Sequence, residues 1–379
     1  MNFEFTDEQK MIRQAARDFA KKLEVDVIER DYRAEYPAQH VKELGELGFL
    51  GMMVDPRYGG GGLDMISYLL AVEEIARIDS SVAVIMSVHN SLVLAGIELY
   101  GSDFLKEKYL PPMVTGEKIG AFLLSEPEAG SDATSQKTLA EDKGDYYLLN
   151  GTKNWITSAA SGSVYIVIAQ TYPEKRHHGI NAFIIEKDTP GISLGQHEDK
   201  MGMRSSDTHS VMFTDVKVPK ENRLGEDGFG FKFAMKALEG GRISIAAQAV
   251  GIAQGAYDRS LKYSKERKAF GKLISEHQAV AFKLADMAVK IENARNLCHK
   301  AGWLKQNGKP YGHLGAMAKL YAADIAMEVT TEAVQIHGGY GYVKEYHVER
   351  LMREAKLTQI YEGTSEIQKI VISRSIFHD

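Results

Sequence analysis

The spacing of hydrophobic and polar residues changes twice along the chain. From about residue 6 to residue 106, apolar residues recur with the period of amphipathic helices. Between about residues 115 and 218 the pattern changes to short β-rich runs, separated by turn signals such as Asn150-Gly151. After Gly228 the helical period returns and continues almost to the end. The pattern therefore predicts helices, then a β region, then helices again.

The β-rich runs follow one another without helices between them. Such an order predicts an antiparallel sheet or small barrel. It argues against the parallel, doubly wound sheet of a nicotinamide-binding domain. The runs are residues 146–149, 164–168, 182–185 and 211–213.

The last part of the chain predicts a four-helix bundle. One long helix runs from about residue 229 to residue 267, a second starts at a capping box of Ser275 and Gln278, and a third ends at Gly338. The C-terminal helix completes the predicted bundle. We predict an α+β multidomain protein with an N-terminal all-α domain over residues 1–115, a middle antiparallel β-barrel domain over 116–222 and a C-terminal four-helix bundle over 223–379.

Composition narrows the class of protein. A chain of 379 residues exceeds one ordinary core, which agrees with several domains. Its net charge of -5 argues against nucleic acid as the main partner. The single cysteine, Cys298, excludes an intramolecular disulfide and fits a reducing compartment. The most apolar stretch, Val82 to Leu94, is interrupted by His89 and Asn90 and is shorter than the ~20 residues of a membrane helix.

The start of the chain predicts a helix where a signal peptide would lie. Thr6 and Gln9 fit a capping box that opens directly into that helix. We therefore expect a cytoplasmic protein, or a mitochondrial matrix protein if the chain has been processed.

The stretch 359–368 sets one carboxylate, Glu362, on a glycine turn before a helix. Ser365 and Gln368 fit a capping box for that helix. By residue type alone, Glu362 is a solvated surface glutamate. Ile360 and Tyr361 before it and a glycine after it also describe a desolvated carboxylate that another molecule approaches closely. Both interpretations, surface residue and general base, stay open at this point.

Four other segments each allow a structural and a functional interpretation. The loop 124–132 is rich in small residues and offers N–H groups to an anion, or is simply a loop. Trp155 beside Thr157 is a core tryptophan or the flank of a planar ring. Arg267 clamps a phosphate or stabilises a helix end. His337 and the glycines after it form either a helix cap or part of a binding site. His337 has no histidine or carboxylate at the spacing of a metal ligand pair.

The order of these motifs resembles the acyl-CoA dehydrogenase family over about the whole chain. The segments Gly241–Ala249 and Phe282–Met287 are most similar to the short-chain (butyryl-CoA) branch. The residues that carry the resemblance are Leu124–Asp132, Trp155–Thr157, Arg267–Gly271, Gln335–Gly341 and Ile360–Gln368.

This resemblance implies an FAD-dependent enzyme that converts a short-chain acyl-CoA, straight or branched, to the trans-2-enoyl-CoA. Glu362 would remove the α-proton while a hydride leaves the β-carbon for flavin N5. The backbone N–H of Glu362 and a ribityl hydroxyl would polarise the thioester carbonyl. Some relatives carry their base just before Arg242, where this chain has Gly241, so Glu362 has no competitor.

The resemblance also implies which residues bind the cofactor and the substrate. The isoalloxazine would be lined by Phe122, Leu124, Ser125, Gly130, Ser131, Trp155, Ile156 and Thr157, with Thr157 near N5 and Ser125 near the pyrimidine edge. Further FAD contacts would come from Thr364, Ser365 and Glu366 at a helix start, and from Arg267, Phe270, Gln278, Gln335, Ile336, His337, Gly338 and Gly339, the pyrophosphate and adenosine being held by a neighbouring subunit. The substrate would contact Ser131, Glu239, Arg242 and Gly363.

A site shared between subunits implies at least a dimer, and the family resemblance implies a homotetramer, a dimer of dimers. Electrons would pass to an electron-transfer flavoprotein. Two alternatives remain: a flavin-dependent oxidase or monooxygenase on the same fold, and a non-catalytic flavin-binding or nucleic-acid-associated relative. Retention of Glu362 favours dehydrogenation. No metal site, nucleic acid or membrane insertion is expected.

Two segments depart from the family pattern. Glu128 stands where many relatives have glycine or a small polar residue, which adds negative charge near anionic ligands. Ser158-Ala159-Ala160 replaces a common Asn-Gly-Gly, which leaves the conformation of that turn open.

Overall fold

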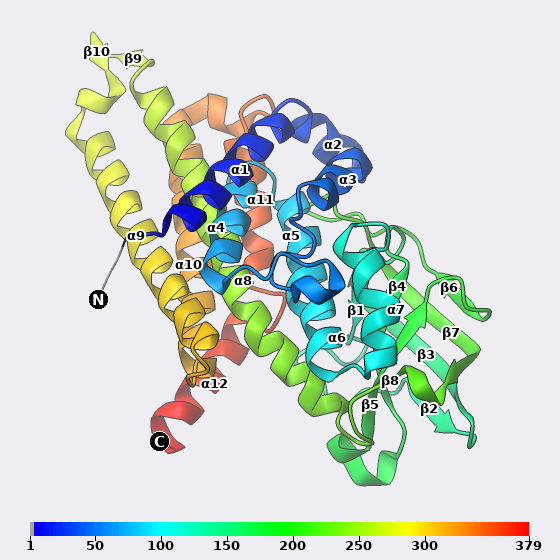
Figure 1. The fold of residues 1–379 in the computed structure, drawn as a ribbon. Helices are drawn as coiled ribbons and strands as arrows, with labels where there is room; N and C mark the ends of the chain where they lie inside the picture. The colour runs from blue at the N-terminus through cyan, green and yellow to red at the C-terminus, as the bar shows by residue number, and fades with distance from the viewer. Residues whose placement is uncertain (1–3, 379) are drawn as a thin grey trace.

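The structure, a computed structural model, describes residues 4–378. Figure 1 shows helices gathered in one body and the strands β1 to β8 on one side of it. The capping box of Thr6 and Gln9 is confirmed, since Gln9 N donates to Thr6 Oγ1 and Thr6 N to Gln9 Oε1. The first helical part comprises α1 (Asp7–Leu23), α2 (Val27–Arg33), α3 (Ala38–Glu46), α4 (Met65–Ala76), α5 (Ser80–Ser87), the π-helical η2 (Val88–Leu94), α6 (Ala95–Tyr100) and α7 (Asp103–Val114).

Helices α5, η2 and α6 form one continuous apolar segment, Ser80–Tyr100. By length and composition it would span a membrane, but 83% of its most apolar window is buried inside the protein, as in a core helix. The interruption at His89 and Asn90 does not end it, because both side chains find backbone partners. Gly120 N donates to His89 Nδ1 at 3.0 Å, so the other ring nitrogen donates to Met113 O. The hydrophobic run is therefore longer than the sequence predicts.

The strands form one sheet in the order β6-β7-β3-β2-β4-β5-β8, with β1 added beside β4. Most neighbouring strands are antiparallel, as predicted, but β4 pairs in parallel with β1 and, through Leu139 and Gln170, with β2. Strands β2 and β3 lie between β1 and β4 in the chain. A connection of this length allows the chain to return, so that β4 runs in the same direction as β1. The strands are β1 (Gly120–Leu123), β2 (Leu139–Asp142), β3 (Tyr146–Thr157), β4 (Val164–Gln170), β5 (Ile180–Glu186), β6 (Ile192–Leu194), β7 (Thr208–Pro219) and β8 (Arg223–Leu224).

Strand β4 connects the two hydrophobic cores, because every one of its residues is buried. Ile166 and Ile168 face the core shared with the helices. Tyr165 and Val167 face a second core inside the sheet domain. Alternate residues of a strand point to opposite faces, so a strand covered on both sides reads as a continuous apolar run.

The second helical part comprises α8 (Gly230–Ser264), α9 (Gln278–Gln306), α10 (Gly312–His337), α11 (Val348–Thr358) and α12 (Ser365–His378), with a small β9–β10 hairpin (Lys268–Ala269, Lys272–Leu273) between α8 and α9. Helices α8, α9 and α10 pack against one another, and α11 packs on α8 and α10. The predicted bundle therefore takes α11 as its fourth helix, whereas α12 contacts α10 and extends away from the bundle (Figure 1). The capping box predicted at Ser275 and Gln278 does not form, because α9 begins after His277 without a side-chain cap.

Candidate active site

Glu362 lies in the turn between α11 and α12, and the turn has an unusual backbone. Glu362 has φ = 51° and Gly363 has φ = 95°, so two consecutive residues are left-handed. A non-glycine residue rarely adopts this conformation without surrounding contacts that fix it. Here the carbonyl of Gly363 accepts from Lys319 Nζ at 2.8 Å and from Gln368 Nε2 at 2.7 Å. Side chains from α10 and α12 thus hold the turn.

The helix after the turn is not capped as predicted. Ile367 N donates to Thr364 Oγ1 at 3.4 Å, while the buried hydroxyl of Ser365 has no partner among the residues that the structure describes. Gln368 uses its amide for the carbonyl of Gly363 and not for a reciprocal cap. The cap is therefore Thr364, one residue before the predicted Ser365, because Gln368 binds the turn and not the N-terminus of the helix.

The carboxylate of Glu362 points into the protein. Its two oxygens are inaccessible to solvent and have no hydrogen-bond partner among residues 4–378, although the residue as a whole is only partly buried. Burial raises the pKa of Glu362 to about 7, against the opposing effects of Lys319 and then Arg242. Since an isolated glutamate normally titrates near 4.5, this environment changes its chemistry from a permanent anion to a group that exchanges protons at neutral pH.

The carboxylate lies against Gly241 of α8. A Cβ at position 241 would overlap Glu362 Oε2 and would come within 2.9 Å of Leu92 Cδ2 from η2. Glycine is therefore required for the carboxylate to occupy this place. The prediction that Ile360 helps to desolvate Glu362 is wrong, because Ile360 is 50% exposed. Helix α8 and η2 exclude water instead.

Tyr361, Gln248 and Tyr68 lie in the surroundings of Glu362. The hydroxyl of Tyr361 donates to Gln248 Oε1 at 2.6 Å, and Gln248 Nε2 donates to Ser80 O. The buried Tyr68 of α4 has a pKa raised to about 12, mainly by burial, with the charge of Glu362 a smaller contribution. Sequence reasoning missed Tyr68, because a tyrosine in an apolar helix has no signal that separates a site wall from a core residue.

Arg242 follows Gly241 and is buried, and its Nε has no hydrogen-bond partner in the described part of the chain. Burial lowers the pKa of its guanidinium, and the charges of Glu239 and Glu362 act in the opposite direction. Glu239 precedes it by one helical turn and accepts from Lys236 Nζ at 2.8 Å. The structure thus brings Glu239, Arg242 and Glu362 into one electrostatic neighbourhood, and an orphaned guanidinium nitrogen there suits an anionic ligand.

The loop after β1 is attached to β3 by a buried lysine. Lys153 Nζ donates to Leu124 O at 2.9 Å, Glu126 Oε1 at 2.8 Å and Gln136 Oε1 at 3.2 Å. Lys153 is fully buried, which lowers its pKa to about 8. Asn154 N donates to Ser125 O at 2.8 Å. The predicted flavin-lining loop and the strand with Trp155 therefore form one connected wall.

Trp155 is not a core residue, since 61% of its surface is exposed and its φ is 61°. The pairing of β3 with β7 shifts register between Lys153 and Ile156, which turns Trp155 outward and Ile156 into the second core. An exposed tryptophan beside Thr157 and open space around Gly130 fit a planar cofactor at this wall.

The turn after Thr157, whose conformation the sequence left open, begins with a left-handed residue. Ser158 has φ = 60°. Its N–H donates to Asp207 O, and the Asp207 carboxylate accepts from Ala160 N at 2.7 Å and Ser161 Oγ at 2.6 Å. Asp207 thereby compensates for residues that do not favour this backbone. The charge of Glu128 is also compensated, because Lys137 pairs with it at the surface.

The second group of predicted FAD residues lies at the other end of α8. Ser264, its last residue, is about 35 Å from Gly241 along the helix axis, at 1.5 Å per residue. The Arg267 guanidinium lies over the Tyr340 ring at 5.5 Å, and His337 stacks on Tyr263 at 4.4 Å. Phe270, Gln278, Gln335, Gly338 and Gly339 are exposed in this region, and Ile336 is buried. One chain therefore does not bring this group to Glu362.

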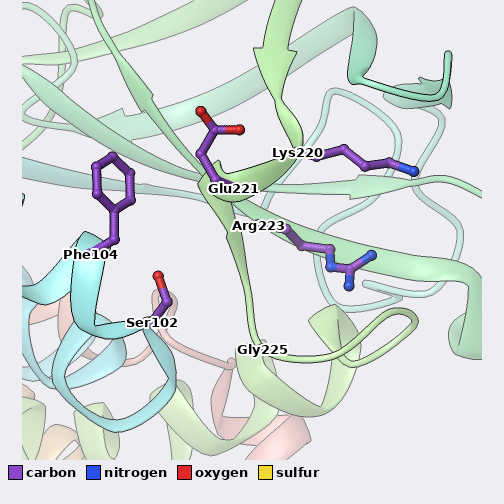
Figure 2. A pocket seen from close by; sticks show the side chains of 6 residues that line it. All are labelled: Ser102, Phe104, Lys220, Glu221, Arg223 and Gly225. Carbon is purple, nitrogen blue, oxygen red and sulfur yellow. The ribbon is translucent and has the colours of Figure 1, made fainter.

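A surface hollow elsewhere lacks the features of a catalytic site. It lies between the start of α7 and β8 and is lined by Ser102, Phe104, Lys220, Glu221, Arg223 and Gly225 (Figure 2). Its two basic side chains point away from Phe104 and are already paired, Lys220 with Asp142 and Arg223 with Asp227. Within residues 4–378, no group of three or more histidine, cysteine, aspartate or glutamate side chains is arranged to hold a metal ion.

Comparison with known proteins decides the family. The model of the acyl-CoA dehydrogenase N-terminal domain matches residues 6–117, that of the middle domain 121–216 and that of the C-terminal domain 228–377. The chain belongs to the acyl-CoA dehydrogenase family. It is 49% identical over 378 residues to the short-chain specific acyl-CoA dehydrogenase of Clostridium acetobutylicum, with all of both chains covered.

Two further relatives extend the comparison. The solved butyryl-CoA dehydrogenase of Megasphaera elsdenii is 50% identical and superposes with a TM-score of 0.98 over 100% of each chain. The caffeyl-CoA reductase–Etf complex subunit CarC of Acetobacterium woodii is 46% identical over 371 residues, covering 97% of this chain and 98% of that protein. The predicted order of a helical, a β and a helical part is confirmed. The protein is an FAD-dependent acyl-CoA dehydrogenase, as the motif order implies.

Proposed function

We propose that this acyl-CoA dehydrogenase acts on short-chain acyl-CoA thioesters, straight or branched, with Glu362 as its catalytic base. The observation that carries the assignment is the carboxylate itself, buried without a partner in a turn held by Lys319 and Gln368. A general base is most effective when its pKa lies near the working pH, and that of Glu362 is about 7. Its protonated form is then a stable product of the step.

Each part of the site has a role in this proposal. Bound FAD supplies the hydride acceptor, and the wall of Leu124 to Ser131 and Trp155 to Thr157 orients it. Glu362 Oε1 or Oε2 takes the α-proton. The backbone N–H of Glu362, which makes no hydrogen bond within residues 4–378, is free to donate to the thioester carbonyl as charge develops there. Arg242 and Glu239 contact the coenzyme A portion.

The preference for short acyl chains rests on two observations. Leu92 and Tyr68 are buried and occupy the space beside Glu362, on the side of η2 and α4. The Megasphaera elsdenii relative is a butyryl-CoA dehydrogenase. One methylene in an apolar pocket changes discrimination by about 1–3 kcal/mol, so the rank order among short chains is open to measurement.

We further propose a homotetramer, a dimer of dimers, in which each FAD contacts two subunits. The residues around Arg267 and Gln335–Gly339 are too far from Glu362 to meet the same cofactor from one chain, so a neighbour would provide them. Phe270 is 97% exposed beside them, as expected of a side chain that another subunit covers. An electron-transfer flavoprotein is the proposed acceptor, because the Acetobacterium woodii relative belongs to an Etf complex. We place the protein in the cytoplasm, or in the mitochondrial matrix if it is processed.

An anaerobic titration of the purified holoenzyme with butyryl-CoA tests the proposal. We expect the visible flavin absorbance to bleach before any acceptor is added, and branched or longer thioesters to bleach it more slowly. Reoxidation by an electron-transfer flavoprotein should be much faster than reoxidation by dissolved oxygen. The reverse order would favour the oxidase alternative, and a flavin that no acyl-CoA bleaches would contradict acyl-CoA dehydrogenation by this chain.

A further inference from the structure

Lys319 is a charged side chain in the apolar interior of α10 for which the mechanism above gives no chemical step. It is fully buried, and the neighbouring helix residues Ala316, Ala318, Ala322 and Ala323 are also buried. Burial of an ammonium group carries a large desolvation cost unless partners offset it. Its one hydrogen bond within residues 4–378 goes to Gly363 O, the residue directly after the base.

We propose that Lys319 is the positioning residue of the catalytic base: it fixes the Glu362–Gly363 turn through the carbonyl of Gly363 and electrostatically stabilises the ionised carboxylate of Glu362. This inference rests on the proposed role of Glu362. Lys319 lies on α10, 43 positions before Glu362 in the chain. In this proposal it controls both the position of the Glu362 carboxylate and the pH at which that carboxylate ionises.

The first part of the argument is geometric. Gly363 O receives two donors that approach from different helices, Lys319 Nζ from α10 and Gln368 Nε2 from α12. The two left-handed residues of this turn are strained when isolated and persist only when the surrounding structure determines them. Two donors on a single carbonyl supply that constraint. The direction of the Glu362 side chain and of its N–H follows from it.

The second part is electrostatic. The groups that act on Glu362 are Lys319 from α10 and Arg242 from α8, while Glu362 itself acts on Tyr361 beside it and on Tyr68 from α4. Lys319 and Arg242 are the cations, and Lys319 has the larger effect in lowering the pKa of Glu362. Arg242 has an unpartnered nitrogen suited to a ligand, whereas Lys319 is already bound to the protein.

The charge state of Lys319 supports this role at neutral pH. Burial lowers its pKa to about 8, opposed first by Glu362 and then reinforced by Arg242, with Asp324 and Glu366 contributing smaller opposing effects. Lys319 is therefore mostly protonated at pH 7. Without it, the buried carboxylate would retain only the guanidinium of Arg242, and its pKa would rise.

A pair of variants separates charge from anchoring. Lys319→Met removes both the charge and a donor to Gly363 O. Gln368→Met removes a neutral donor, which binds Gly363 O at 2.7 Å and Glu362 O at 3.4 Å, and no charge. The first readout is the rate of flavin reduction by butyryl-CoA in single turnover between pH 6 and 10. The second is the titration of the Glu362 carboxyl by ¹³C NMR of substrate-free enzyme, its resonance being assigned by its loss in Glu362→Gln.

In Lys319→Met we expect both midpoints to move up by about one to three pH units, the usual effect of losing a nearby opposite charge. The rate at pH 7 should fall at least about fivefold and recover toward pH 10, since a base must be ionised to act. In Gln368→Met the rate should fall at all pH values while the midpoints stay at about 7. Lys319→Gln should show the same shift in both midpoints as Lys319→Met. It replaces Lys319→Met in the experiment if the methionine variant does not fold.

Unchanged midpoints in a folded, FAD-bound Lys319→Met or Lys319→Gln would overturn the proposal. An equal shift in Gln368→Met would do so as well, because it would show that geometry alone moves the titration. Failure of the base assignment appears separately, as full activity of Glu362→Gln. In that case the NMR titration still reports whether Lys319 controls the carboxyl.

Discussion

At the scale of single residues, the proton affinity of Glu362 follows from contacts that exclude water without replacing its hydrogen bonds. Gly241 makes room for the carboxylate, and α8 and η2 close over it. Burial penalises the charged form, while Lys319 and Arg242 prevent the pKa from rising further. The result is a carboxyl group whose pKa, raised to about 7, lies near neutral pH.

The first prediction concerns Glu362→Gln. The variant should keep FAD but lose at least about 100-fold in the rate of flavin reduction, because an amide accepts no proton and general base catalysis contributes about 10²–10⁴. Flavin absorbance measures FAD content, and anaerobic stopped-flow with butyryl-CoA measures the rate. A folded, FAD-bound variant that reduces its flavin at the wild-type rate would rule out Glu362 as the base.

The same substitution predicts a pH-dependent change in stability. The pKa of Glu362 is raised in the folded state from 4.5 to about 7, so its contribution to stability is fully present below pH 4.5 and is lost as the pH rises through 7. Glutamine does not ionise and escapes this loss. We expect the Tm of Glu362→Gln to exceed that of the wild type above pH 7 and the difference to shrink toward pH 5. A difference independent of pH would contradict the raised pKa.

A third prediction concerns Gly241→Ala. The new Cβ would overlap Glu362 Oε2, so the carboxylate must move and flavin reduction should slow at least about tenfold, as misplacement of a catalytic group does. Gly315→Ala is the matched control, because a Cβ there meets Ile243 only at an ordinary contact distance of 3.4 Å. Equal rates in both variants would show that Gly241 is not needed for the placement of Glu362.

At the scale of elements, a buried ion pair joins the loop after β1 to β3. Glu126 accepts from Lys153, and also from the backbone N–H groups of Lys137 and Thr138. These contacts lower the pKa of Glu126 even though burial alone would raise it. The pair fixes the loop relative to Trp155 and thus the shape of the proposed flavin wall.

The fourth prediction follows from this pair. Lys153→Met should destabilise the protein by about 3–5 kcal/mol, because it leaves a buried carboxylate without its cation. It should also weaken FAD retention by loosening the loop. The double variant Glu126→Gln/Lys153→Met should recover part of the stability, since the orphaned charge is gone. Thermal unfolding and the ratio of flavin to protein absorbance measure both effects, and no recovery in the double variant would contradict the electrostatic explanation.

At the scale of the whole molecule, the length of α8 separates two groups of predicted FAD residues. Glu362 contacts its first third at Gly241, and Arg267 follows its end. Since the helix is rigid, no local rearrangement brings the two together. Association with a second chain is the simplest arrangement that does, and a twofold axis would then create two equivalent sites.

The fifth prediction tests this sharing by subunit mixing. Arg267→Ala and Glu362→Gln should each be nearly inactive. If each FAD contacts two chains, mixed dimers contain one site with both Glu362 and Arg267 intact. Random reassociation of equal amounts should then restore about a quarter of the wild-type activity, because half of the dimers are mixed and one of their two sites is complete. No recovery after verified mixing would show that each site belongs to one chain.

The sequence by itself determined the order of helical and β regions, the approximate bounds of α8, α9 and α10, and the family. These features depend on local periodicity and on the order of motifs, and both can be read directly from the sequence. The capping box at Thr6 is another local feature and is confirmed. The direction of β1, the identity of α11 as fourth bundle helix and the cap at Thr364 were not determined, because they depend on which partner each segment meets.

Only the tertiary structure decided that the carboxylate of Glu362 is buried and not solvated at the surface. The residues that desolvate Glu362 come from α8 and η2, far away in the sequence, and the neighbouring Ile360 does not contribute. Lys319 likewise appears in the sequence only as one lysine in an alanine-rich helix. The burial of a side chain and the charges around it depend on contacts between segments that are distant in the sequence. Periodicity therefore predicts the helix on which a residue lies, but only tertiary packing brings Glu362, Gly241 and Lys319 together.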